Sequence, residues 1–90
     1  MVIPKVLYIG TQTIKVTLKP LSEIDSDCSG GWARWEQNEL IIANDIPEDR
    51  QFYLFWHEVL HFINVYFSEK EATYLAECIC QVLKDNDFVK

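Results

Sequence analysis

Apolar and polar side chains alternate along residues 14–18, where isoleucine, valine and leucine are separated by lysine and threonine. A period of two predicts a strand with one buried face. An apolar stretch at residues 6–9 lies just before it, and residues 10–12 between the two are turn formers with a glycine. We therefore expect an antiparallel hairpin that ends at Pro20.

A second pair of strands is expected after residues 22–31, which are polar, acidic and glycine-terminated and predict a loop. Residues 32–36 and 39–43 are rich in apolar and aromatic side chains and meet near residues 37–38. This arrangement favours another antiparallel hairpin. The first half of the chain is therefore predicted to form a small antiparallel sheet of two hairpins.

A helix is predicted from about Glu48 to Tyr66, after a segment with cap-type side chains and a proline at residue 47. Apolar side chains recur at spacings of three and four and form a core stripe. The stripe comprises Phe52, Phe55, Trp56, Val59, Leu60 and Ile63. Leu54, Phe62 and Val65 lie off this stripe, so the helix is apolar on nearly every side and should lie at the centre of the fold.

A second helix is predicted from Ser68 to about Lys84, because Ser68 and Glu71 have the spacing of a capping box. Its expected buried face comprises Ala72, Leu75, Ala76, Ile79, Val82 and Leu83. Strands followed by helices predict an α+β fold. We expect one domain over residues 1–90, with the sheet packed on both helices.

The composition narrows the classes of function. The chain has 90 residues, 49% of them hydrophobic, and a net charge of −6 without a run of lysine or arginine. This charge argues against nucleic acid and anionic membranes as partners. No apolar stretch reaches the roughly 20 residues that a membrane span needs, and residues 1–10 do not resemble a signal peptide.

The three cysteines, Cys28, Cys78 and Cys80, do not pair evenly, and the last two would point to different sides of a helix. Reduced thiols in the cytoplasm are the expected state. Their expected role is packing as small apolar side chains.

The segment from His57 to His61 reads HEVLH and contains both histidines of the chain. On a helix, residues four apart lie on one face, so the two imidazoles can bind one Zn²⁺. Glu58 would then act as general base on a water at the metal. The alternative is that the pattern arose by chance and that both histidines lie on the helix surface. A charged Glu58 among apolar neighbours, however, costs free energy unless it has a partner.

A catalytic zinc takes three protein ligands, and the chain has no third histidine. Glu69 and Glu71 are the candidates, because a helix–turn–helix would bring them back beside the histidines. Glu71 already has a role in the capping box. Glu69 shares a helix face with Ala72 and Ala76, whose small side chains permit close approach, so we favour Glu69 and keep Glu71 as the alternative.

The motif and residues 69–76 (EKEATYLA) together resemble the gluzincin pattern of ImmA/IrrE-type metallopeptidases. The resemblance implies that Glu69 is the zinc ligand, and it places Thr73 where the family has a supporting Asn or Asp. It covers roughly residues 31–86. The compact ending is similar to relatives encoded by bacteriophages and prophages, which implies a zincin-like core in a bacterial cytoplasm.

The expected function is hydrolysis of peptide bonds in a protein or peptide substrate by a zinc-activated water. An extended substrate could add to the strand at residues 39–43. Tyr53, Tyr66 or Tyr74 could stabilise the oxyanion, and Trp32 or Trp35 could line the cleft, whereas Trp56 should pack in the core.

Two other interpretations remain open. The chain could be a catalytically silent zincin scaffold of a phage or mobile element that binds a host protein. A structural zinc site is less favoured, because closed sites prefer four cysteine-rich ligands. The sequence leaves the oligomeric state undetermined.

Overall fold

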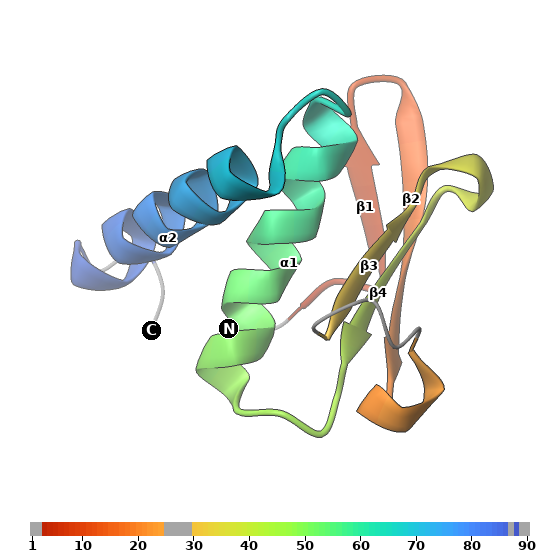
Figure 1. Cartoon of the computed structure of the whole chain (residues 1–90), viewed down its shortest axis with the longest axis horizontal. Helices are drawn as coiled ribbons and strands as arrows, with labels where there is room; N and C mark the ends of the chain where they lie inside the picture. Colours follow the sequence, from red (N-terminus) through yellow and green to blue (C-terminus); the bar gives the residue numbers. More distant parts are fainter. Residues whose placement is uncertain (1–2, 25–29, 87, 89–90) are drawn as a thin grey trace.

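The computed structural model describes residues 3–24, 30–86 and 88. Within these residues the chain forms four strands and two α-helices, so the predicted α+β class is confirmed (Figure 1). The elements are β1 (Val6–Ile9), β2 (Gln12–Lys19), β3 (Gly31–Arg34), β4 (Glu39–Ala43), α1 (Glu48–Ile63) and α2 (Glu69–Asp85). Leu21–Glu23 forms a short 3-10 helix. The rest of the predicted loop comprises Ile24 and Gly30, which are described, Gly31, which begins β3, and residues 25–29 with Cys28, which lie outside the described residues.

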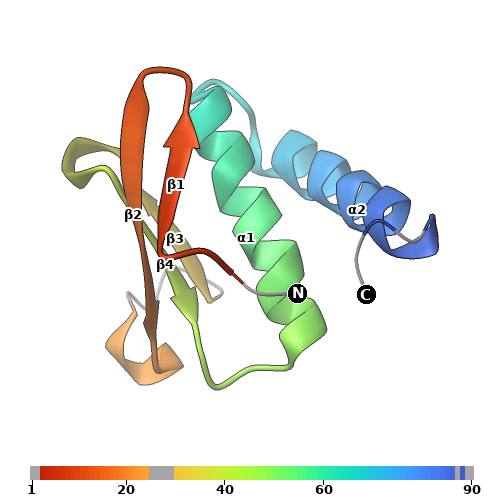
Figure 2. The ribbon, with the colours of Figure 1, turned by 180° about the vertical axis from the view of Figure 1, so that it is seen from behind.

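The strands form one sheet in the order β1-β2-β4-β3, and both predicted hairpins are confirmed (Figure 2). The prediction of a wholly antiparallel sheet is wrong, because β2 and β4 pair in parallel, with Val16 opposite Leu40. The reason lies in β4, where residues 40–43 are all buried. A strand buried on both faces takes a central place, so β4 inserts between β2 and β3 and leaves β3 at the edge.

The second hairpin turns earlier than predicted. β3 ends at Arg34, and a 3-10 turn at Trp35–Gln37 leads to Asn38, which has a left-handed φ of 49°. Asparagine tolerates this conformation better than most residues. The turn places Trp35 against α1, where its indole N–H donates to the backbone carbonyl of His61 at 3.1 Å.

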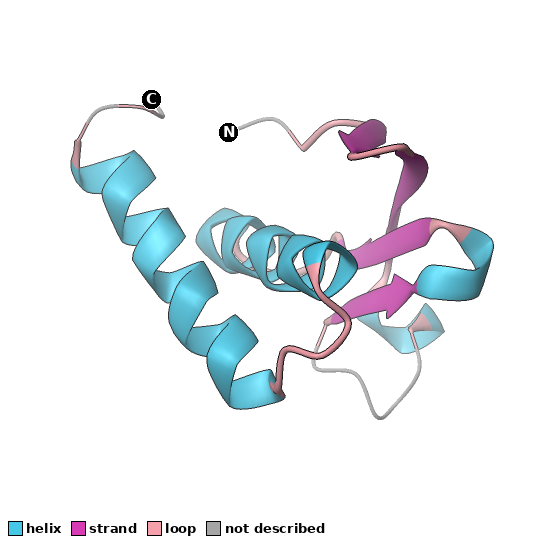
Figure 3. Ribbon diagram, turned by 90° about the horizontal axis from the view of Figure 1, so that it is seen from above, coloured by secondary structure: helices cyan, strands magenta, loops and turns pink. Residues whose placement is uncertain are grey.

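Helix α1 lies between the sheet and α2, as its nearly all-round apolar surface predicted (Figure 3). The prediction that the sheet packs on both helices is wrong, because α2 packs on the side of α1 that faces away from the sheet. Its buried apolar side chains come from the predicted stripe and from outside it: Phe52, Leu54, Phe55, Val59, Leu60 and Phe62. The helix ends at Ile63, three residues before the predicted Tyr66, because the backbone at Asn64 becomes extended. Ile63, which belonged to the predicted core stripe, is exposed and does not join the core.

Helix α2 begins with the predicted capping box. The Ser68 N–H donates to Glu71 Oε1 at 3.0 Å, and the Glu71 N–H donates to Ser68 Oγ at 3.1 Å. Ala72 and Ala76 are fully buried against the rest of the fold, whereas Val82 of the predicted face is exposed. No helix in the described part of the chain has the length and apolar character needed to cross a membrane.

Candidate metal centre

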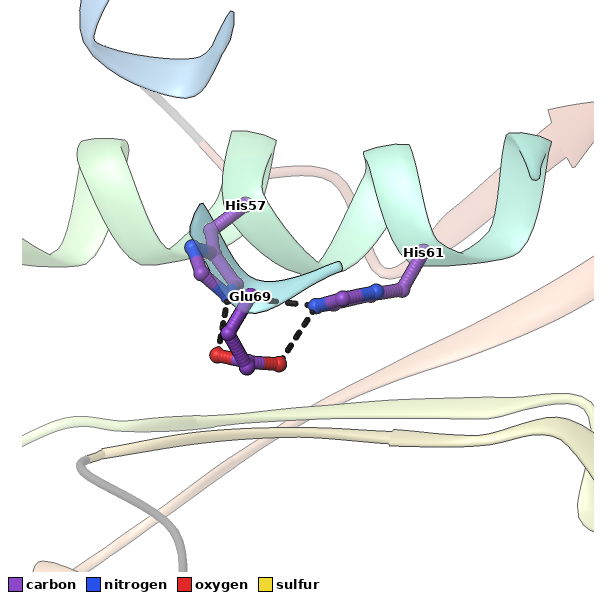
Figure 4. A group of neighbouring side chains, drawn as sticks. All are labelled: His57, His61 and Glu69. Atoms are coloured by element: carbon purple, nitrogen blue, oxygen red, sulfur yellow. Dashed lines mark hydrogen bonds and ion pairs between the residues drawn. The ribbon is translucent and has the colours of Figure 1, made fainter. Parts of the chain in front are cut away.

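The two helices bring three potential metal ligands together: His57 and His61 from α1, and Glu69 from the first turn of α2 (Figure 4). His57 Nε2 lies 3.1 Å from one carboxylate oxygen of Glu69, and His61 Nε2 lies 2.8 Å from the other. The two Nε2 atoms are 3.2 Å apart. The three side chains therefore converge on one point between the helices.

These separations fit a zinc ion. Ligand atoms that each lie about 2.0–2.1 Å from a tetrahedral Zn²⁺ are about 3.3 Å from one another. The two imidazole nitrogens match this spacing at 3.2 Å, and each has a different Glu69 oxygen within 2.8–3.1 Å. With one ligand atom from each residue, all three atoms lie within 4.8 Å of one another. Two imidazoles and one carboxylate are also a donor set used by catalytic zinc sites. The residues present thus suit zinc with one coordination position left open.

The surroundings of His57 favour metal binding. Both imidazoles are buried, and burial lowers the pKa of His57, an effect partly offset by the charge of Glu69. A neutral imidazole is the form that binds a metal. The Tyr53 hydroxyl lies 3.4 Å from Nδ1 of His57, the ring nitrogen that points away from Glu69. Such a contact helps to orient a ligating imidazole.

Glu71, the alternative third ligand, is engaged elsewhere. Hydrogen bonds with Ser68 hold its carboxylate at the start of α2 and lower its pKa. Its side chain is exposed and is not part of the cluster of possible ligands among the described residues. The structure brings Glu69, and not Glu71, to the two histidines.

Glu58 lies next to the cluster with its side chain buried. Burial raises the pKa of its carboxyl group to about 7, with a further contribution from the charge of Glu69, while a hydrogen bond from the Ala33 backbone opposes the shift. Gly31 of the same strand also lies against the Glu58 carboxylate. The edge strand β3 therefore fixes this carboxylate from the side opposite α1.

A pocket of about 300 Å³ contains the cluster. Trp32 and Trp35 line it, as the sequence suggested, whereas Trp56 packs against the core. Of the three tyrosines considered, Tyr53 lines the pocket, and Tyr66 and Tyr74 are exposed elsewhere. The lining residues are Gly31, Trp32, Ala33, Trp35, Arg50, Tyr53, Leu54, His57, Glu58, His61, Glu69 and Thr73.

The prediction that an extended substrate adds to the strand at residues 39–43 is wrong. This strand is β4, and both of its edges are paired, one with β2 and one with β3. The strand beside the pocket is β3, at the edge of the sheet. Sequence reasoning could not assign this role, because which strand lies at the edge depends on the parallel pairing of β2 with β4.

Sequence reasoning also missed Arg50 and the β3 backbone as parts of the site. Arg50 lies seven residues before His57, a spacing that returns to the same helix face, so this signal was available. The contact between β3 and Glu58 joins residues far apart in sequence, and no local pattern indicates it. Cys78 and Cys80 are free thiols on α2 and do not line the pocket.

No family model, curated protein or solved structure matches this chain.

Proposed function

We propose that this protein is a zinc-dependent peptidase of the gluzincin type, with a zincin-like arrangement of its helices. In this proposal His57, His61 and Glu69 hold the zinc ion, and Glu58 is the general base. The observation that supports it most is the meeting of two imidazole nitrogens, 3.2 Å apart, with the Glu69 carboxylate, whose two oxygens each lie 2.8–3.1 Å from one of them. The pocket that holds them also contains a buried glutamate.

A bound zinc ion would supply Lewis acidity and lower the pKa of a water molecule in the pocket. The residues of the chain perform the proton transfers. Glu58 accepts the proton of the water as its oxygen attacks the peptide carbonyl carbon. It then donates that proton to the amine as the C–N bond breaks. The Ala33 N–H holds the Glu58 carboxylate in place for both transfers.

The substrate is a protein or peptide in an extended conformation. The edge strand β3 contributes Gly31, Trp32 and Ala33 to the pocket wall. Main-chain groups on the free side of an edge strand can bind an extended peptide by strand addition. In β3 the Ala33 N–H is not one of these groups, because it donates to Glu58. β3 is therefore the strand that we assign to substrate binding.

The test compares the wild-type chain with Glu58→Gln. Native mass spectrometry measures zinc per chain, and mass spectrometry of a peptide library after incubation measures cleavage. We expect one zinc in both proteins and a loss of about 100-fold or more in the cleavage rate of the variant. A wild-type chain that binds zinc and leaves the library intact would instead support a non-catalytic, protein-binding role for the scaffold.

A further inference from the structure

Arg50 is the one cationic side chain, apart from the histidines, among the described residues that line the pocket. It lies on the same face of α1 as His57 and His61. Its guanidinium group is 5.3 Å from the centre of the Tyr53 ring, and Tyr53 in turn contacts His57. Arg50 is therefore held on the wall of the pocket, along the line of the histidines.

The stability of α1 does not explain this arginine. Arg50 is the third residue of the helix, where the positive end of the helix dipole disfavours a cation. Asp49, beside it, pairs with Lys84 at 2.8 Å. No ion pair within the described part of the chain joins Arg50 to a carboxylate, and its side chain is exposed. Its guanidinium group is thus free to bind an anion in the pocket.

The direction of the elements decides which end of a substrate would meet Arg50. β3 is antiparallel to β4, and α1 runs back in the direction opposite to β4 (Figure 1). α1 and β3 therefore run in the same general direction. Antiparallel pairing is the commoner arrangement of neighbouring strands, so we take the peptide to add antiparallel to β3. It then runs the other way, and the residues after its scissile bond lie toward the start of α1, where Arg50 is found.

The spacing sets how far from the scissile bond this contact occurs. Seven helical residues separate Arg50 from His57, about 10 Å along the helix axis. An extended peptide covers this distance in about three residues. Arginine binds carboxylates with two parallel hydrogen bonds, and a carboxylate is the anionic group that an unmodified peptide offers.

We propose that Arg50 binds a carboxylate on the C-terminal side of the scissile bond, within about three residues of it. This carboxylate is the chain end of a short peptide or the side chain of an aspartate or glutamate. Arg50 is then a residue that determines substrate specificity. The inference rests on the proposed peptidase function, and it concerns binding rather than the chemical step.

The test uses the full chain with zinc added and Glu58→Gln present, so that peptides stay intact. Acetyl-Ala-Leu-Ala-Ala is titrated as the free acid and as the amide, and acetyl-Ala-Leu-Asp-Ala-amide is compared with its Asn counterpart. NMR follows the protein backbone and the Arg50 Nε–H and gives each Kd. We expect about tenfold tighter binding of at least one of the two anionic peptides, and the pair that differs identifies the source of the carboxylate.

Arg50→Gln should bring the ratio of Kd values within each pair to about one, and Arg50→Lys should restore part of it. Lys15→Gln removes one positive charge from an exposed side chain of β2 outside the pocket, and it should leave the ratio unchanged. Equal or undetectable binding of both members of each pair, or a preference that survives Arg50→Gln, would overturn the assignment. The preference would survive Arg50→Gln if the peptide carboxylate bound to the zinc itself.

The same peptides incubated with the zinc-loaded wild-type chain test the peptidase function separately. A binding preference that depends on Arg50, without cleavage, supports the carboxylate site and rejects the peptidase. Cleavage of acid and amide at equal rates with equal affinity retains the peptidase and rejects the role of Arg50.

Discussion

Gly31 lies so close to Glu58 that a Cβ atom at residue 31 would come within 2.9 Å of the Glu58 Oε2 atom. The backbone at Gly31 does not have a positive φ, unlike that of Gly10 and Gly30. The need for glycine at residue 31 is therefore a matter of space. The absence of a side chain lets the β3 backbone approach the buried carboxylate.

Gly31→Ala should lower stability by about 1–3 kcal/mol, because the added methyl group overpacks the contact with Glu58. The same substitution in a Glu58→Ala background should cost much less, since the crowding atoms belong to the Glu58 side chain. Urea unfolding of the four proteins in this double-mutant cycle measures the difference. An equal cost in both backgrounds would show that Gly31 is constrained by something other than Glu58.

Glu69→Ala should weaken zinc binding by more than about 100-fold. This loss is larger than the one caused by removing a residue that only hydrogen-bonds to a metal ligand. The reason is that Glu69 supplies the only carboxylate in the cluster formed by the described residues. Glu71→Ala is the matched control. It removes the capping box and should lower the melting temperature slightly while leaving the zinc Kd unchanged. Competition titration with a chelator measures both constants, and the reverse order of effects would make Glu71 the ligand.

Local patterns predicted most of the elements of this fold. The period of two in residues 14–18 predicted β2, and the capping box at Ser68 predicted the start of α2, because each pattern depends only on residues near in sequence. The parallel pairing of Val16 with Leu40 could not be predicted in the same way. Periodicity states which face of a strand is buried, but it does not identify the neighbouring strand. The continuous apolar run in β4 was the one sign of a central position.

In the candidate site, too, local patterns predicted some residues and long-range packing placed the others. The positions of His57 and His61 follow from helix geometry, and the short connection to α2 indicated Glu69. The contact of Glu58 with Ala33 could not be foreseen, because it depends on how the edge strand packs on α1. The sequence therefore indicated the residues proposed to carry the chemistry. The residues that hold these side chains in place were found only from the tertiary structure.

The metal-free protein should become more stable when Glu58 is replaced by glutamine, and the gain should grow with pH. Burial raises the pKa of Glu58 from 4.5 to about 7, so the folded state binds more protons than the unfolded state between these values. Stability from this group is therefore lost as pH rises through that range. The shift corresponds to roughly 3 kcal/mol, at about 1.4 kcal/mol for each unit of pKa.

Urea unfolding in the presence of EDTA at pH 4, 5.5 and 7.5 measures this gain. At pH 4 both side chains are neutral, and the two proteins should have similar stability. Glu69→Gln in the same buffers is a useful comparison, because the Glu69 side chain is 80% exposed and is not desolvated in the way that Glu58 is. A difference between wild type and Glu58→Gln that does not vary with pH would contradict the buried carboxyl group described here.

Glu39 should show the opposite dependence on pH. Its carboxylate accepts hydrogen bonds from Thr17 Oγ1 at 2.7 Å and from Arg34 Nη1 at 2.8 Å, and so joins β4 to both neighbouring strands. The hydrogen bond from Thr17, together with Arg34 and against the effect of burial, lowers the pKa of Glu39. The folded state then binds fewer protons than the unfolded state below about pH 4.5, so the stabilisation is present above that pH and is lost as pH falls. Glu39→Gln should cost about 1–2 kcal/mol at pH 7 and much less at pH 3, while Glu36→Gln, in the exposed turn, should have little effect at either pH.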